Sequence, residues 1–161
     1  MQFPSVRRSA VLALTAATVL TTVSCSSADE LTQRWATLLA PPAFALRSLW
    51  LTWFDAEGLM TPVVVPIDEL PLLPDPVVVQ GVLRLHDTVV DSGDGSPQHL
   101  ALALCRPGTP LITAEDDEWA EALRDHLDGQ LDGTWSLHVA AGGSITPLVL
   151  PPARTWPRQA G

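Results

Sequence analysis

The stretch HLALALCRPGTPLITAEDDEWAEALRDHLDGQLDGTWSLHVA, residues 99–140, decides the fold class because it predicts a strand, a helix and another strand in succession. Its first seven residues are a largely apolar run of strand length, which is typical of a buried strand. Thr113 is a good helix N-cap, and the four carboxylates that follow complement the positive end of the helix dipole. At 134–140, apolar residues alternate with Ser136 and His138, which predicts a half-buried strand that exposes these two side chains.

The sequence on either side of this stretch predicts further helices and strands. Ser27 and Glu30 fit a capping box in front of an apolar helical stripe, and Asp75-Pro76 is a typical helix start. Pro62 indicates a strand at a sheet edge. The expected order is a helix after residue 27, strands at 46–54 and 59–65, a helix after 75, a strand at 99–105, a helix after 113, and strands at 134–140 and 145–150. This order predicts an α/β or α+β fold, with three helices and a mixed sheet of about five strands.

Length and charge limit the classes of protein that remain. The chain has 161 residues, enough for a single domain, which we expect at 25–152 between a signal-peptide-like segment at 1–24 and a disordered Pro/Gly-rich tail at 153–161. Nine basic residues against 18 acidic ones give a net charge of −9, which argues against a nucleic-acid partner. Two cysteines are too few for a disulfide framework or a Cys-rich zinc site.

The first 25 residues are typical of an export signal. Arg7 and Arg8 precede an uncharged apolar segment at 9–23, which is too short for a comfortable membrane span. Ser24-Cys25, followed by polar residues, resembles the lipobox of bacterial lipoproteins. The resemblance implies lipidation of Cys25, a location in the cell envelope, and membrane contact only through that lipid anchor. Simple secretion, or a start codon further downstream with a cytoplasmic product, are the alternatives.

The residues most able to carry chemistry lack the spacing that chemistry needs. No two of the four histidines stand two, three or four residues apart, so the sequence predicts no local metal site, no catalytic set and no cofactor. His86 lies on an apolar helical face and is expected to be a core histidine, whereas His138 is expected at the surface. Cys105 ends a buried strand and is expected to be an inert core thiol.

One longer arrangement resembles JAB (MPN) domains, in which a strand ends in His-x-His-Pro and an Asp opens the next helix. Here Leu104-Cys105-Arg106-Pro107 ends the strand, and Ala114 and Asp117 hold the positions of the family's Ser and Asp. Leu and Arg replace both zinc-binding histidines, so the resemblance implies a domain without its metal that acts as a binding module. We expect Arg106 to pair with Asp117 or another carboxylate of 115–118, in place of the metal charge.

These observations favour a non-enzymatic binding domain with an unidentified protein or small molecule as its partner. Trp50, Trp53 and Trp156 would be aromatic anchors if exposed and core residues if not. The alternative is a small hydrolase or a metal-dependent, JAB-like enzyme, with a site assembled from scattered His and Asp residues.

Overall fold

The structure of the protein is a computed structural model, and it describes residues 25, 27–92, 98–131 and 133–152. The segments 1–24 and 153–161, expected as signal and tail, lie outside the described residues, as does Trp156. The elements in chain order are α2 (Ala28–Leu38), β1 (Ser48–Phe54), β2 (Met60–Asp68), α3 (Pro76–Ser92), β3 (His99–Cys105), α4 (Ala114–Leu127), β4 (Thr134–Ala141) and β5 (Ser144–Val149).

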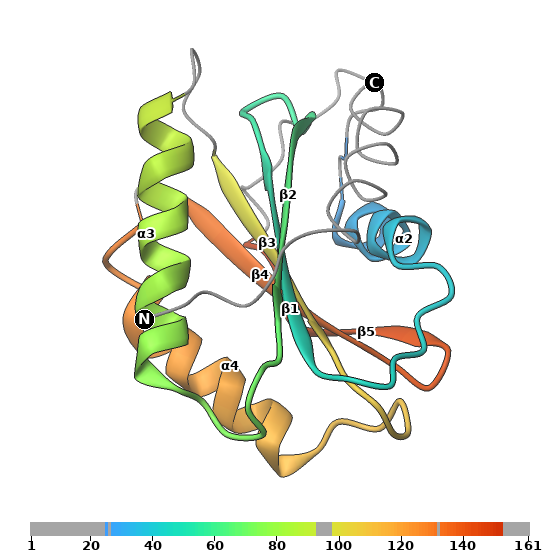
Figure 1. Ribbon diagram of the computed structural model, residues 1–161. Coiled ribbons are helices and arrows are strands. Elements are labelled where there is room, and N and C mark those ends of the chain that lie inside the picture. The colour runs from blue at the N-terminus through green and yellow to red at the C-terminus, as the bar shows by residue number, and fades with distance from the viewer. Residues whose placement is uncertain (1–24, 26, 93–97, 132, 153–161) are drawn as a thin grey trace.

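The five strands form one mixed sheet in the order β2-β1-β3-β4-β5 (Figure 1). Only β3 and β4 are parallel, and α4 connects them; every other neighbouring pair is antiparallel. The predicted fold class is confirmed: the described residues form a single α+β domain with three helices and a mixed five-stranded sheet.

Helices cover both faces of the sheet, α3 and α4 on one and α2 on the other (Figure 1). The first core lies under α3 and α4 and includes Leu51, Trp53 and Trp119. The second core lies under α2 and includes Trp35, Phe54 and Cys105. Successive strand residues point to opposite faces, so each central strand contributes to both cores.

This second layer corrects one expectation. Ser136 and His138 were predicted on a solvent-facing side of their strand, but both are fully buried. The alternation in β4 is real, yet its polar side faces α2 and not water. A half-buried pattern fails here because the helix that covers the second face lies about 100 residues earlier in the chain.

The helix starts follow the predicted capping chemistry. Thr113 and Asp116 form a complete capping box at α4, and Ser27 Oγ accepts a hydrogen bond from the Glu30 amide at α2. Asp75 Oδ1 accepts the Val77 amide at the start of α3.

Both sheet edges carry proline, which removes backbone donors from the strand ladder. Pro62 and Pro66 lie in the edge strand β2, and Pro147 lies in the edge strand β5.

Candidate functional site

One end of the sheet gathers four connections, at residues 39–47, 69–75, 106–113 and 142–143, and we call it the loop end. β1 begins there, β2 and β3 end there, and β4 turns into β5. Backbone hydrogen bonds join neighbouring connections: Gly143 N donates to Pro42 O at 3.1 Å, and Leu70 N donates to Arg47 O at 3.0 Å. In open sheets with parallel strands, ligands bind outside the carboxyl ends of those strands, which here are the ends of β3 and β4.

Arg106 organises the connection between β3 and α4. Its Nε and Nη2 bind Asp116 Oδ1 and Oδ2, both at 2.8 Å, and the two side chains are 2% and 0% exposed. Its remaining donors reach the carbonyls of Pro107, Thr109 and Leu111 at 3.1, 2.9 and 2.7 Å. The guanidinium therefore fixes the turn between β3 and α4 from within.

The carboxylate of this pair differs from the residue that the JAB resemblance places there. Asp117 is exposed, whereas Asp116 occupies the third helical position and also accepts the Thr113 amide at 2.9 Å. Burial alone would raise the pKa of Asp116, but the hydrogen bonds from Arg106 and Thr113 hold it below its usual value. Asp116 is thus the charged partner of Arg106, one residue before Asp117.

Large exposed apolar side chains concentrate at the loop end. Leu46 and Leu111 are 73% and 74% exposed there, on two different connections. The others at this end are Leu72, Leu73, Val77 and Ile112; of the described large apolar residues only Leu150, beside the opposite end of β4, is exposed elsewhere. Exposed apolar side chains that gather in one region of a surface are typical of an interaction site.

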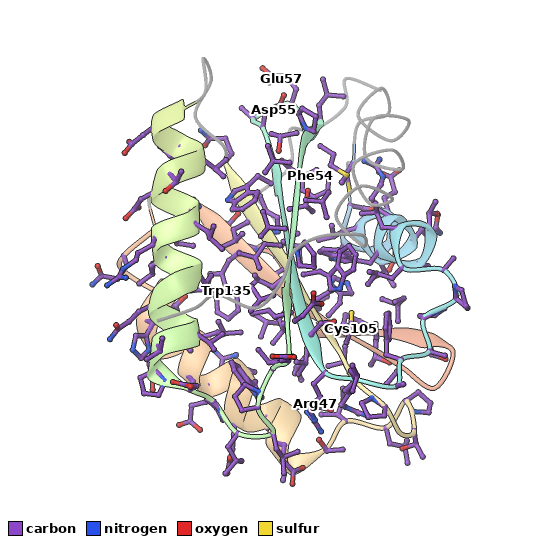
Figure 2. The ribbon with its side chains drawn as sticks, viewed as in Figure 1. Arg47, Phe54, Asp55, Glu57, Cys105 and Trp135 are labelled. Atoms are coloured by element: carbon purple, nitrogen blue, oxygen red, sulfur yellow. The ribbon has the colours of Figure 1, made fainter. Side chains whose placement is uncertain are left out.

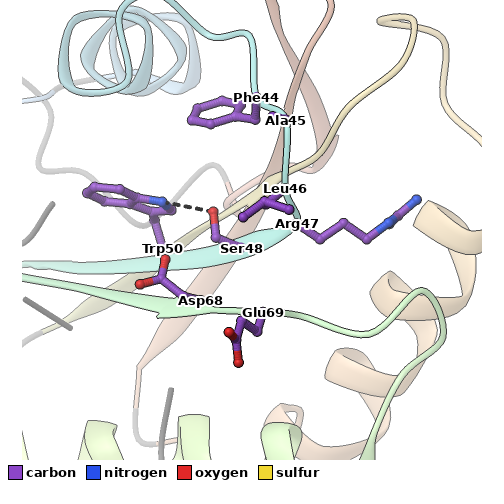
Figure 3. Close-up of a pocket in the computed structure, with 8 residues that line it drawn as sticks. All are labelled: Phe44, Ala45, Leu46, Arg47, Ser48, Trp50, Asp68 and Glu69. Atoms are coloured by element: carbon purple, nitrogen blue, oxygen red, sulfur yellow. Dashed lines mark hydrogen bonds between the residues drawn. The ribbon is translucent and has the colours of Figure 1, made fainter. Parts of the chain in front are cut away.

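A pocket of about 490 Å³ opens at the loop end beside these side chains (Figure 3). Ser48, Trp50 and Asp68 form its floor, since Ser48 pairs with Asp68 across the β1–β2 ladder. Phe44 and Leu46 line one side and Glu69 follows Asp68 on the other. Trp50 Nε1 donates to Ser48 Oγ at 3.1 Å, which fixes the indole ring. Burial, and then the neighbouring Glu69 charge, raise the pKa of Asp68.

A buried polar chain crosses the sheet beneath α2. His99 Nδ1 lies 2.7 Å from Thr134 Oγ1, and His99 Nε2 lies 2.8 Å from Ser136 Oγ. His138 Nε2 lies 2.8 Å from Thr32 Oγ1 on α2, while its Nδ1 is buried without a hydrogen-bond partner. The sequence analysis did not predict this group. Polar residues at alternate positions of β4 were its one sign in the sequence, and they were interpreted as solvent-exposed.

The surroundings of this buried polar group keep both histidines neutral. Burial, followed by repulsion from His138, lowers the pKa of His99 to about 3, and burial lowers the pKa of His138 to about 4. Ser136 has no access to solvent. A serine activated by histidine needs a base that can take a proton near neutral pH, and it needs a path for substrate. The buried group of Ser136, His99 and Thr134 has neither.

Cys25 lies at the opposite end of the sheet from the loop end. Its amide donates to Gly58 O, in the β1–β2 turn, at 2.7 Å, and its side chain is buried in the second core. Burial raises the pKa of the Cys25 thiol to about 11, against the opposing effect of Arg34. Figure 2 shows Asp55 and Glu57 of this turn at one extreme of the molecule and Arg47 at the other.

Other candidate residues belong to the cores. His86 accepts a hydrogen bond from Trp53 Nε1 at 3.1 Å, inside the first core. Cys105 is buried, and burial raises the pKa of its thiol to about 12 despite a hydrogen bond with Ser48. Trp50 and Trp53 are 8% and 0% exposed, which rules out their use as protruding anchors.

Across residues 25, 27–92, 98–131 and 133–152, no three His, Cys, Asp or Glu side chains come together in a way that could hold a metal ion. None of the described helices combines the length and apolar character that crossing a membrane requires.

Comparison of this chain with protein-family models, with curated proteins and with solved structures finds no match.

Proposed function

We propose that this chain is a non-enzymatic binding domain that recognises a protein partner at its loop end. The observation that carries the proposal is the concentration of exposed Leu and Ile side chains on its connections, with Val77 beside them at the start of α3. The Arg106–Asp116 pair supports it, because a connection held by a buried ion pair presents Leu111 in one conformation before binding.

The sheet edges favour the same conclusion by limiting the alternatives. A partner that adds a strand needs an edge with a free row of donors and acceptors. Prolines in β2 and in β5 interrupt that row at both edges. Side-chain docking at the loop end therefore accounts better for a binding role than strand addition does.

The charged residues at the loop end indicate which kind of partner segment would bind there. The acidic residues at or next to the loop end are Asp68, Glu69, Asp75, Glu115, Asp117 and Glu118. Of the described basic residues at this end, Arg106 is buried and paired, which leaves Arg47. A partner segment with apolar side chains flanked by Lys or Arg complements this surface.

Selection of peptides from a random library on the purified chain tests the proposal. Leu111→Asp should weaken the selected peptides about tenfold or more, because truncating or charging a central apolar contact costs at least about 1–2 kcal/mol. Leu150→Asp makes the same change on a side chain that is 59% exposed outside the loop end and should leave binding unchanged. Equal binding by both variants would overturn the proposal.

We also propose that Cys25 is lipidated and tethers the domain to the cell envelope. The support is the lipobox-like sequence, together with the position of Cys25 in front of the Ser27 cap of α2. An acylated thiol cannot stay in the second core, so acylation would withdraw Cys25 from Gly58. That withdrawal breaks one backbone hydrogen bond and leaves the capped helix in place.

We further propose that the chain is a JAB-like domain that has lost its metal. The support is the position of Pro107 and Asp117, and the Arg106–Asp116 pair beside them, with its positive charge where the family has a zinc-binding histidine. The double variant Leu104→His, Arg106→His tests it by zinc binding in calorimetry. Acquired zinc affinity supports the kinship, and a variant that zinc neither binds nor stabilises counts against it.

The buried Ser136–His99–Thr134 group does not support the alternative of a small hydrolase. Its full burial and the low pKa of His99 deprive it of both substrate access and a working base, so we do not propose it.

A further inference from the structure

We infer that the pocket at the loop end, formed by residues 44–50 and 68–69, receives a positively charged aliphatic side chain of the partner. The inference rests on the proposed function, and it adds the chemical group that the pocket selects: the ammonium or guanidinium of a Lys or Arg.

The pocket has room for a long side chain. Its volume of about 490 Å³ lies in the range of sites that bind small ligands. Phe44 and Leu46 provide an apolar wall on the connection before β1, with Trp50 close by on the floor (Figure 3). A four-carbon stem can lie along such a wall while its charged end reaches further in.

The charges of the pocket select a cation over other ligands. Asp68 stands on the floor with its carboxylate on the same side of β2 as Trp50, so an anion would meet that carboxylate; the Glu69 carboxylate lies on the other side of β2 (Figure 3). A neutral apolar group would bury Asp68 further without compensating its charge. A cation compensates the Asp68 carboxylate, and it gains further from the aromatic faces of Phe44 and Trp50.

The nearest cation of the protein itself does not fill this role. Arg47 contributes to the lining, but its side chain extends away from Trp50 and Asp68 (Figure 3). Trp50 Nε1 is already engaged with Ser48 Oγ, so the floor offers carboxylate oxygens and no strong free donor from the indole. The pocket is therefore an acceptor site.

Titration with butylammonium chloride, followed by the NMR signal of the Trp50 indole N–H, tests the inference directly. Butylammonium should give a saturable shift, and sodium butyrate, with the same stem and the opposite charge, should not. The double variant Asp68→Asn, Glu69→Gln should bind butylammonium about tenfold or more weakly, since charge-assisted hydrogen bonds are lost. Asp117→Asn, together with Glu118→Gln, removes the same charge elsewhere at this end and should leave the titration unchanged.

Equal shifts with butyrate, or equal loss in the two double variants, would overturn the inference. Its failure can be told apart from failure of the proposed function. If selected peptides depend on Leu111 but butylammonium does not bind, the binding domain stands and the cation pocket falls. If butylammonium saturates the pocket while no peptide depends on Leu111, the pocket stands and the apolar docking surface falls.

Discussion

Arg106 binds Asp116 side-on, with Nε 2.8 Å from one carboxylate oxygen and Nη2 2.8 Å from the other, where β3 passes into α4. The same carboxylate closes the capping box of α4, so one residue serves both the helix start and the connection. The geometry of the loop end therefore depends on Asp116, which both caps α4 and binds Arg106.

Replacing Arg106 should therefore destabilise the protein strongly. Arg106→Ala leaves a buried carboxylate and three carbonyls without their donor, and we expect a loss of about 3–5 kcal/mol in the free energy of unfolding. Arg106→Lys keeps the charge but not the two-pronged geometry, and should recover only part of the loss. Urea denaturation measures both. Arg84→Ala, on the exposed side of α3, is the control and should change stability by no more than about 0.5 kcal/mol; an equally small effect at Arg106 would contradict the prediction.

Stability should fall with acidification below pH 6.5. The pKa values of His99 and His138 are about 3 and about 4 in the folded protein, against an ordinary value of 6.5 in the unfolded chain. Between pH 6.5 and about 4 the unfolded chain binds more protons, so each histidine lowers the free energy of unfolding by up to about 1.4 kcal/mol per pH unit. Asp68, whose raised pKa acts in the opposite direction, reduces the slope only near its own titration.

Denaturation midpoints between pH 4 and 7 measure this slope. His138→Gln should halve it by removing one of the two protons, whereas His126→Gln, outside the buried chain, serves as the control. A slope that is the same in wild type and in His138→Gln would contradict the assignment.

Gly58 should be intolerant of a side chain for a reason that Gly129 does not share. Both have positive φ, +80° and +83°, so alanine at either position costs about 1–2 kcal/mol of backbone strain. At Gly58 a Cβ would also lie 2.2 Å from the Cys25 carbonyl oxygen, whereas nothing lies within 4 Å at Gly129. In protein that carries no acyl group, Gly58→Ala should therefore lose more stability and also speed the labelling of Cys25 by a thiol reagent, as read by peptide mass spectrometry. Similar labelling rates in the two variants would show that Cys25 is not held by this turn.

The tether proposal makes a separate prediction about Cys25. In the native host, the protein should partition with membranes and carry the mass of the acyl groups, while Cys25→Ser should be released in soluble form. The matched change Cys105→Ser concerns a thiol deep in the second core and should not affect partition. A soluble wild-type protein without added mass would refute lipidation.

Local signals in the sequence were enough to predict most of the fold. Thr113 and Ser27 mark helix starts because the physics of capping involves only neighbouring residues. Pro62 marks an edge because a missing N–H is tolerated only there. Neither signal depends on distant parts of the chain.

The failures have the opposite character, since each depends on contacts between distant segments. His138 was placed in solvent because nothing near it in sequence shows that Thr32 lies against it. The prediction that Arg106 pairs with a carboxylate of 115–118 is confirmed, but which of the four carboxylates it binds depends on which side of a helical turn faces Arg106. The pocket joins Phe44 to Glu69 through the register of β1 and β2, which no residue pattern states.

The position of Cys25 at the far end of β1 has a consequence for an anchored chain. Acylation would withdraw Cys25 from the β1–β2 turn, but the Ser27 cap of α2 follows only two residues later. Seven residues of extended strand separate this end of the sheet from the loop end, a span of about 20 Å. At physiological ionic strength the Debye length is about 8 Å, so the potential of an anionic bilayer has decayed almost completely over that span. A basic partner at the loop end would then be attracted by the carboxylates of this protein alone, without competition from lipid headgroups. In that arrangement the length of β1 keeps the binding surface far enough from the membrane that the membrane potential does not affect binding there.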